Sequence, residues 1–356
     1  MSDSALARIP IEIWFKILKH VIDAPEYFDA PCTGSFSDFM RESKNPQQYF
    51  QSMSHLKRIK KVCRSWECFA AENTHRLVDI KYISSLPLEA VRRAHAANIK
   101  DNVYNAFECS TLWRKVTISI TAVDHATALS RLARNSSRHP YLRRIYITYK
   151  LRDTAYLTCL RYLNNITLLS LSFSTACCPH LDDQVTLDQV EVLIWETSEA
   201  DLSPFKFFYL PSLRHLAITG PFSDSLPLDT ALKGTLVSLY VDGTSTGKFQ
   251  VSDLFAFPKL EEFATNRRID ATNFPLCRTL PSLVRMYLDA GLGGNIGEIK
   301  TMLVSGLRGS FTLRAGFRWG DGAAQCDLDE IMKSCEKQGI KLVDSAGNAR
   351  PVVPVK

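Results

Sequence analysis

Long apolar runs and catalytic signatures are missing from this sequence. No stretch approaches the roughly 18 apolar residues that a membrane-spanning helix needs, and the N-terminus lacks a secretory signal pattern. There is no His-Glu-x-x-His motif and no Walker-type loop, and the eight histidines are scattered away from any ordered acid and nucleophile. We therefore expect an intracellular protein, cytoplasmic or nuclear, with no membrane partner, no catalytic residues and no enzymatic activity.

The sequence also has no Cys-x-x-Cys pair among its ten cysteines. In a chain of this length without a secretion signal, such cysteines are more often buried free thiols than disulfide partners. Cys177, Cys178 and His180 lie close together, but adjacent cysteines are poorly placed to bind one tetrahedral ion, and no second ligand pair occurs at finger spacing. We predict no metal site.

Strong charge of either sign is absent, since the net charge is +6 over 356 residues. One basic run, Lys57 to Arg64, has the composition of a nuclear localisation signal or a nucleic-acid patch. Helical spacing predicts a buried side of this segment, so its basic residues are expected on the solvated face of a helix. The residues on the buried side would be Ile59, Val62, Cys63 and Trp66. No nucleic-acid partner is predicted.

A complete dinucleotide-binding fingerprint is missing as well. The stretch Gly291 to Gly297 follows a predicted strand and precedes a predicted helix, which is the context that such a loop requires. Ile296 occupies the place of the third glycine, however, and no acid ends the next strand. We predict no cofactor, and a nucleotide-dependent oxidoreductase is the most distant of three functional hypotheses.

What the sequence does contain is a period. The pattern apolar-x-x-apolar-x-apolar recurs eight times, and after a first interval of 29 residues the spacings are 24, 24, 23, 23, 24 and 23. A constant period of this length is typical of solenoids, in which each repeat buries its apolar face against its neighbours. The triads are Trp113/Val116/Ile118, Leu142/Ile145/Ile147, Ile166/Leu169/Leu171, Val190/Leu193/Trp195, Leu213/Leu216/Ile218, Leu236/Leu239/Val241, Leu260/Phe263/Thr265 and Leu283/Met286/Leu288.

Turn-forming residues keep the same register. Two positions before the second to eighth triads stand Pro140, Asn164, Asp188, Pro211, Gly234, Pro258 and Pro281, which end a helix or form a turn before a strand. Helical pieces are expected between strands at 124–135, 153–164 and 297–307, and a closing unit is expected as strand 311–317, helix 327–337 and strand 339–343.

The array resembles leucine-rich repeats. That family places Asn or Cys three residues after each triad, where the side chain satisfies the turn. Other residues stand at these positions here, which predicts an irregular horseshoe: Lys150, Ser174, Ser198, Pro221, Thr244, Arg268 and Gly291.

The N-terminal residues predict an amphipathic helix. Pro10 suits the first helical position, and apolar residues recur at i, i+4 from Ile13 and from Trp14. With a second signature downstream, the two segments read Ile9-Pro10-x-Glu12-Ile13-Trp14-x-x-Ile17-Leu18 and Val62-Cys63-Arg64-x-Trp66. The pair resembles the F-box common in fungal F-box proteins, a helical motif by which substrate receptors attach to cullin-type ubiquitin ligases.

This resemblance implies a non-catalytic substrate adaptor of a Skp–cullin–F-box ubiquitin ligase. The F-box would bind a Skp-type adaptor protein, and through it a cullin, while the solenoid would bind an unidentified protein substrate. The matching residues that would contact the adaptor are Ile9, Pro10, Ile13, Ile17, Leu18, Val62, Cys63 and Trp66.

The second hypothesis is a stand-alone leucine-rich-repeat interaction scaffold with no ligase role. Solenoids need terminal caps with a polar outer face, and the N-terminal helices would serve as one. Ile13, Ile17 and Trp66 would then be buried within the chain itself.

The expected fold is therefore α/β, with a helical N-terminal unit and an irregular solenoid whose parallel sheet lines the concave side. The F-box is expected over 1–75, with an irregular Pro-containing insertion at 24–54 and a second helical segment at 54–73. A helical linker follows over 76–110, with a helix at 86–98. The solenoid and its C-terminal cap then occupy 111–345, and a flexible tail 346–356.

The concave side is the predicted binding surface. Because side chains alternate along a strand, residues between and just after the apolar positions face this side. Tyrosine is enriched in interfaces, and acids suit a basic or amine-bearing partner. The predicted substrate-binding residues are Tyr146, Tyr240 and Tyr287 from the central row, and Glu196, Asp242 and Asp289 from the next row.

Overall fold

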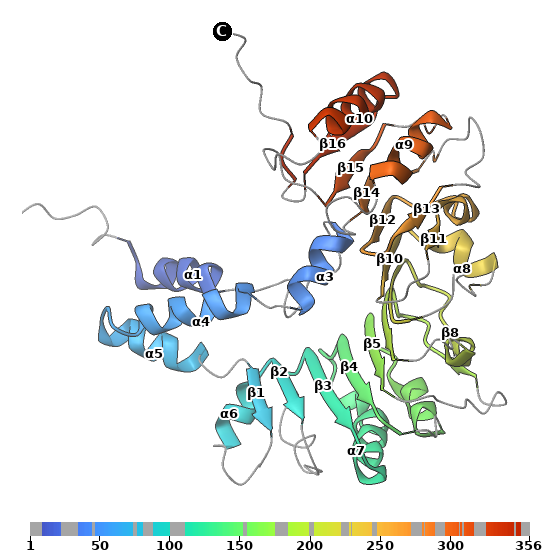
Figure 1. The fold of residues 1–356 in the computed structure, drawn as a ribbon. Coiled ribbons are helices and arrows are strands. Elements are labelled where there is room, and N and C mark those ends of the chain that lie inside the picture. The colour runs from blue at the N-terminus through green and yellow to red at the C-terminus, as the bar shows by residue number, and fades with distance from the viewer. Residues whose placement is uncertain are drawn as a thin grey trace, which may run out of the picture.

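The computed structural model describes residues 9–22, 35–44, 47–73, 77–80, 88–99, 111–151, 155–174, 184–198, 203–221, 228, 230–243, 248–271, 280, 282–288, 296–305, 307, 310–316, 325–344 and 347–349. They form one long curved sheet, helices along its outer side and a separate group of N-terminal helices (Figure 1). None of the described helices is long and apolar enough to cross a membrane.

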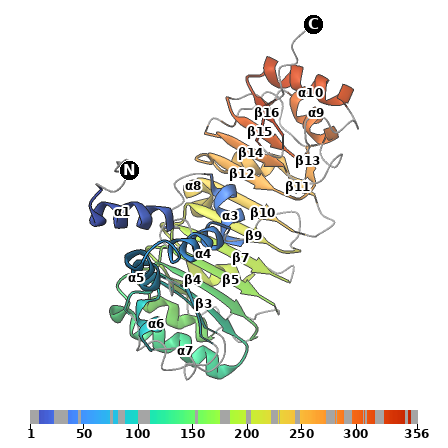
Figure 2. The ribbon, with the colours of Figure 1, turned by 90° about the vertical axis from the view of Figure 1, so that its left-hand side faces the viewer.

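All strands of the main sheet are parallel, and neighbours follow chain order around an arc (Figures 1 and 2). A solenoid gives this topology because each turn lays its strand beside the strand of the preceding turn. The twelve strands are β1 (Leu77–Ile80), β2 (Ala96–Ile99), β3 (Lys115–Ile120), β4 (Arg144–Tyr149), β5 (Leu168–Phe173), β7 (Val192–Thr197), β9 (His215–Thr219), β10 (Ser238–Asp242), β12 (Glu262–Thr265), β14 (Arg285–Leu288), β15 (Thr312–Ala315) and β16 (Lys341–Val343). The predicted α/β fold with a parallel sheet is confirmed.

Short helices and minor strands carry the chain back along the convex side (Figure 1). The helices are α6 (Leu88–Arg93), α7 (Val123–Arg134), α8 (Thr230–Thr235), α9 (Ile296–Val304) and α10 (Gln325–Lys337), with 3-10 turns η4 (Ser136–Arg138), η5 (Ala155–Tyr162), η6 (Ser203–Phe207) and η7 (Val251–Ala256). Two small parallel pairs join β6 (Val185–Thr186) to β8 (Phe208–Tyr209) and β11 (Phe249–Gln250) to β13 (Ile269–Asp270). The helices and strands predicted after residue 111 are present, with ends shifted by a few residues.

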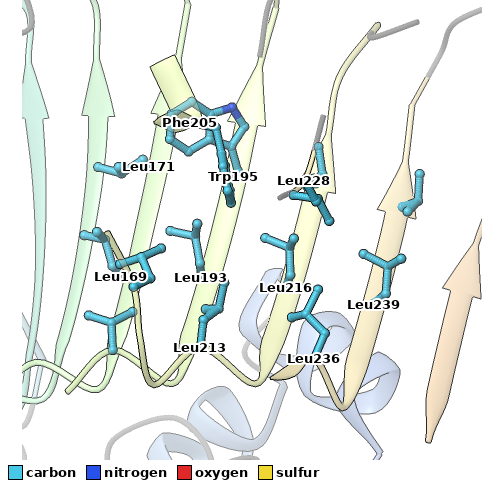
Figure 3. Packing of buried hydrophobic residues seen from close by; sticks show 14 of the residues in the cluster. Leu169, Leu171, Leu193, Trp195, Phe205, Leu213, Leu216, Leu228, Leu236 and Leu239 are labelled. Atoms are coloured by element: carbon cyan, nitrogen blue, oxygen red, sulfur yellow. The ribbon is translucent and has the colours of Figure 1, made fainter. Parts of the chain in front are cut away.

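The predicted triads form the core between the sheet and these outer elements. Every residue of the eight triads is buried. The middle residues pair in one register from Val116 to Met286, so leucines of neighbouring strands stack in columns (Figure 3). Each turn therefore buries its apolar side chains against the turns before and after it.

The sheet begins earlier than predicted. The expected helical linker over 76–110 contains strands β1 and β2, and β2 pairs with β3. The expected helix at 86–98 ends as α6 at Arg93, and Ala96 and Ala97 lie in β2. Alanine favours helices, but pairing with strands on both sides outweighs this weak local preference.

The N-terminal helices form a unit with its own small core. It consists of α1 (Ile11–Ile22), α4 (Gln47–Ile59) and α5 (Arg64–Asn73). The expected helical segment at 54–73 is divided by a turn at residues 60–63. The prediction that Val62 and Cys63 lie on a buried side was wrong, because both stand in this turn and are exposed. The core of this unit is Leu18, Leu56, Ile59, Phe69 and Ala70, with Phe15, Met53 and Trp66 packed against it.

The insertion at 24–54 is not irregular throughout. Residues 23–34 and 45–46 lie outside the described residues, but α3 (Phe36–Lys44) lies between them and α4 begins within the insertion. Prolines flank α3 in sequence at positions 31 and 46, which favoured the prediction of a loop. The helix forms because its apolar residues Phe36, Phe39 and Met40, at i, i+3 and i+4, pack on the sheet.

Two glycines allow close contact between neighbouring turns at the ends of their strands. At Gly220 (φ 155°) an added Cβ would lie 2.4 Å from the backbone oxygen of Thr197, and at Gly243 one would lie 2.2 Å from the backbone oxygen of Gly220. Asn266 Oδ1 accepts a hydrogen bond from the Gly243 N–H at 3.2 Å. These glycines lie two residues after their triads, one position before the turn positions Pro221 and Thr244.

Replacing Gly220 with alanine is expected to lower the free energy of unfolding by about 1–3 kcal/mol, because the backbone must shift to relieve the contact with Thr197. Gly234→Ala is the matched control, since nothing lies within 4 Å of a Cβ built there and the residue is helical. That change should leave stability unchanged or raise it by about 0.5–1 kcal/mol. Urea titrations of both variants measure the difference, and an unchanged midpoint for Gly220→Ala would contradict the expectation.

Candidate functional site

Three rows of side chains run along the concave face of the sheet in strict register. The first row was not predicted as a row and contains Lys115, Arg144, Leu168, Val192, His215, Ser238, Glu262, Arg285, Thr312 and Lys341. The central row contains Tyr146, Ser170, Ile194, Ala217, Tyr240, Ala264 and Tyr287, as the sequence predicted. Glu196 and Asp242 lie in the next row, and Asp289 lies outside the described residues.

Helix α3 covers part of this face. Figure 1 shows it on the inner side of the arc, and Figure 2 shows it in front of the middle strands. We call the surface beneath it the concave groove, which consists of Leu168, Val192, Ile194 and Ala217, flanked by Tyr146 and Tyr240. Phe36, Phe39 and Met40 of α3 are buried on this groove. The predicted binding row is therefore covered over these strands and not open.

The N-terminus of α3 is held by one carboxylate of the sheet. Glu262 accepts hydrogen bonds from the backbone N–H groups of Phe36 (3.0 Å) and Ser37 (2.8 Å). It also accepts from the hydroxyls of Ser35 (2.9 Å) and Ser37 (2.7 Å). An anion at this end of a helix is stabilised by the free N–H groups and the helix dipole.

Cations complete the electrostatics at the same end. Glu262 is 4% exposed and forms an ion pair with Arg285, whose Nη1 lies 3.1 Å from Oε2. Arg314 Nη1 lies 4.0 Å from the Asp38 carboxylate of α3. A buried carboxylate is costly unless it is paired, and here both Arg285 and the helix terminus compensate it.

Aromatic and basic side chains lie at the other end of the groove. The Arg144 guanidinium lies over the Phe39 ring at 5.5 Å, and Lys115 Nζ lies 4.5 Å from the Tyr146 ring centroid. Burial, and secondly the charge of Arg144, lowers the pKa of Lys115 to about 7. Burial raises the pKa of Tyr146. This end therefore favours aromatic and anionic groups over cations.

His215 lies in the middle of the first row. Its ring is 5.4 Å from the ring of Phe36, and its Nδ1 is 3.0 Å from Ser238 Oγ. Burial, assisted by Arg214, lowers the pKa of His215 to about 4 although Glu262 opposes the shift. At neutral pH the imidazole beside the Phe36 ring is therefore uncharged.

The third row, which contains Glu196 and Asp242, is less buried than the first two rows, and tyrosines of the central row lie beside it. Tyr240 donates a hydrogen bond from its hydroxyl to Asp242 Oδ2 at 3.3 Å, and both side chains are part-buried. Burial raises the pKa of Tyr287, whose ring lies 5.5 Å from the Arg314 guanidinium. Glu196 is also part-buried.

A second candidate surface lies on the N-terminal helices. We call it the apolar stripe, and its exposed members are Ile11, Ile13, Ile17, Val21 and Val62. Of the residues predicted to contact an adaptor, Ile13 (43% exposed), Ile17 (42%) and Val62 (59%) belong to the stripe. Pro10 and Cys63 are exposed, Ile9 and Trp66 are part-buried, and Leu18 lies in the core of the unit.

Two features of the sequence indicate the α3 contact. Ser35-x-x-Asp38 is a capping pattern at a helix start, and the structure shows the Asp38 N–H donating to Ser35 Oγ at 3.3 Å. Alternation also predicts that the residue just before each middle triad residue faces the concave side. That position is apolar at Leu168 and Val192 but acidic at Glu262.

No described group of histidine, cysteine and acidic residues is arranged to hold a metal ion. Cys177, Cys178, His180 and residues 291–295 of the glycine stretch lie outside the described residues. Gly243 to Gly247 also fits Gly-x-Ser-x-Gly, a nucleophile pattern that requires a strand leading directly into a helix. Here β10 precedes the motif, and the next described element is the strand β11, so the pattern supports no catalytic role.

Comparison with known proteins gives little beyond this geometry. No family model matches the chain, and no curated protein matches it. A solved structure described as the crystal structure of a TLR13–ssRNA13 complex aligns with 76% of this chain and 38% of its own chain, at 10% identity and a TM-score of 0.35. The fold assignment therefore rests on the strand pairing.

Proposed function

We propose that this chain is a substrate-recognition subunit of a Skp–cullin–F-box ubiquitin ligase. In this proposal the N-terminal helices bind the Skp-type adaptor, and the solenoid binds the protein to be modified. The observation that carries the proposal is the apolar stripe on α1 and at the turn before α5.

The stripe is not needed for the fold of its own unit. Leu18 and Phe15 of α1 already pack on α4 and α5, and Phe15 stacks on Phe69 with 5.2 Å between ring centroids. Ile13, Ile17 and Val21 lie beside this contact at i, i+4 spacing and remain exposed. Exposed apolar side chains gathered along one side of a helix are typical of a protein-interaction surface.

The scaffold hypothesis predicts burial of the same residues. Ile13, Ile17 and Trp66 would be buried as part of a cap of the solenoid. Trp66 meets this in part, since its ring lies 5.4 Å from that of Trp14 within the unit. Ile13 and Ile17 are more than two-fifths exposed. This exposure supports the ligase subunit over the scaffold.

The proposed protein performs no bond chemistry. It holds a substrate near a ubiquitin-charged enzyme, so its contribution is proximity and orientation. The stripe anchors the chain to the ligase, and the long curved sheet sets the distance between the anchor and the substrate.

The test is binding of purified Skp-type adaptor to the full chain by pull-down and calorimetry. Ile13→Asp/Ile17→Asp should abolish binding, because two carboxylates would lie against an apolar partner surface. Lys19→Asp is the matched control, since it places the same group on another part of α1 and should leave binding unchanged. Circular dichroism and the melting temperature verify that each variant is folded.

Failure of the wild-type chain to bind the adaptor would refute the ligase proposal. Equal binding by the wild type and the double variant would refute the role of the stripe. In the first case the scaffold becomes the function that the geometry supports.

A further inference from the structure

We infer that the concave groove is a receptor for an amphipathic helix of a partner protein, and that α3 occupies this receptor in the unbound chain as an internal competitor. The inference deepens the proposed function, on which it rests, because it names the class of substrate segment that the solenoid recognises. It follows from the way in which α3 is bound.

The contact has the features of helix-in-groove recognition. An amphipathic helix inserts apolar anchors at i, i+3 and i+4 into a matching apolar surface. Phe36, Phe39 and Met40 have this spacing and are buried on four aliphatic residues of the groove and its two flanking tyrosines. The aromatic anchors stack on each other with 5.9 Å between ring centroids.

Polar contacts fix the direction of the helix. Glu262 receives the first N–H groups of α3, so a bound helix must start at β12 and β14 and run toward β4. An acidic residue in the first turn is matched by Arg314, as Asp38 shows. The partner segment is therefore a helix with free N–H groups at its start, an acid in its first turn and two or three apolar anchors.

The main core of the solenoid does not depend on α3. The residues beneath α3 form a cluster separate from the continuous core on the other side of the sheet. A helix of nine residues is too short to be stable alone, since isolated helices need about 12–15 residues. The main core of the sheet can therefore remain folded when α3 leaves the groove, and α3 then loses its helical structure. A partner helix can replace its contacts one for one.

A tethered helix is a strong competitor. Segments joined in one chain meet at effective concentrations on the order of millimolar. The apparent affinity of a separate partner is reduced by the fraction of molecules in which the groove is free. Weakening the docking of α3 should therefore strengthen binding of a helix from outside.

The test uses the full-length chain and a fluorescein-labelled synthetic peptide with the sequence of residues 35–44, followed by fluorescence anisotropy. The Phe36→Ser/Met40→Ser variant removes two anchors of α3 and leaves the groove unchanged. It should bind the peptide at least about tenfold more tightly than the wild-type chain. A peptide carrying the same two substitutions is the control and should not bind. Equal affinity of both proteins, or no binding to the variant, would overturn the inference.

A second variant tests the same inference in case the first variant does not fold. Ser35→Asp/Ser37→Asp keeps the apolar anchors but places two carboxylates where two hydroxyls now donate to Glu262. Like charges repel at this distance, so α3 should again leave and peptide binding should again strengthen.

The two proposals fail separately in these experiments. The Ile13→Asp/Ile17→Asp chain should bind the peptide as the wild type does, whatever the adaptor pull-down shows. The α3 variants should in turn bind the adaptor as the wild type does if the ligase proposal holds.

Discussion

Replacing Trp195 with alanine is expected to lower the free energy of unfolding by about 3–5 kcal/mol. Trp195 is fully buried in β7, near the middle of the sheet, and faces aromatic rings of neighbouring turns. Its ring lies 4.7 Å from that of Phe173, measured between centroids. The ring of Phe205 lies 5.6 Å away and is seen beside Trp195 in Figure 3. Removal leaves a cavity that the turns on either side cannot close without changing their register.

The Trp195→Phe variant distinguishes the contribution of side-chain volume to stability from that of hydrogen bonding. Within the described part of the chain, the Trp195 indole N–H has no hydrogen-bond acceptor. Phenylalanine should therefore cost much less than alanine, since it keeps most of the ring volume and loses no polar contact. Urea unfolding monitored by circular dichroism measures both variants, and similar losses for the two would contradict this assignment of the energy to packing.

The alanine variant should also alter cooperativity. In a repeat array stability is approximately a sum of nearest-neighbour terms, so a defect in one central turn weakens its coupling to both sides. Two transitions in place of one are then expected, and hydrogen exchange should show the turns around β7 opening before those near the ends of the sheet.

Replacing Glu262 with alanine in the Phe36→Ser/Met40→Ser variant, in which the groove is already free, is expected to weaken peptide binding. The carboxylate receives four hydrogen bonds from residues 35–37 and pairs with Arg285. Truncating one partner of a buried, hydrogen-bonded charge costs about 2–5 kcal/mol, which corresponds to a loss of at least about 30-fold in affinity. Both the internal helix and the external peptide depend on this carboxylate, whereas the variants of α3 affect only the internal one.

Glu261→Ala is the matched control because it removes the same functional group from the adjacent, exposed position. Its backbone contacts to neighbouring turns remain possible, since alanine keeps the N–H and the carbonyl. In the Phe36→Ser/Met40→Ser background, the control should bind the peptide as tightly as that variant without further change. Retained peptide affinity after Glu262→Ala in the same background would show that the apolar anchors alone hold the helix.

The part of the fold that could be predicted from sequence is the part governed by local repetition. Each triad lies within six residues, and each turn packs on turns about 24 residues away. The period in the sequence therefore predicts which residues of neighbouring strands pair. The positions of Tyr146, Tyr240 and Tyr287 on the concave face follow from the same register and strand alternation.

The parts that could not be predicted depend on distant contacts. Ser35 and Glu262 are separated by 227 residues in the chain, and neither local propensity nor spacing relates them. Strands β1 and β2 are short, and Ala96 and Ala97 gain strand structure only through pairing with β1 and β3. The adaptor-binding role of the stripe stays a prediction, because burial shows which residues are exposed but not what covers them.

The sequence distance between α3 and Glu262 has a consequence for synthesis. Translation adds about 5–20 residues per second, so the 227 residues between Ser35 and Glu262 take about 10–45 s to make. For most of that time the N-terminal helices, which end at Asn73, are complete while the anchoring carboxylate does not exist. Each nascent chain therefore carries α3 on the ribosome without its anchoring carboxylate, which takes its place in the sheet only when β12 joins β10.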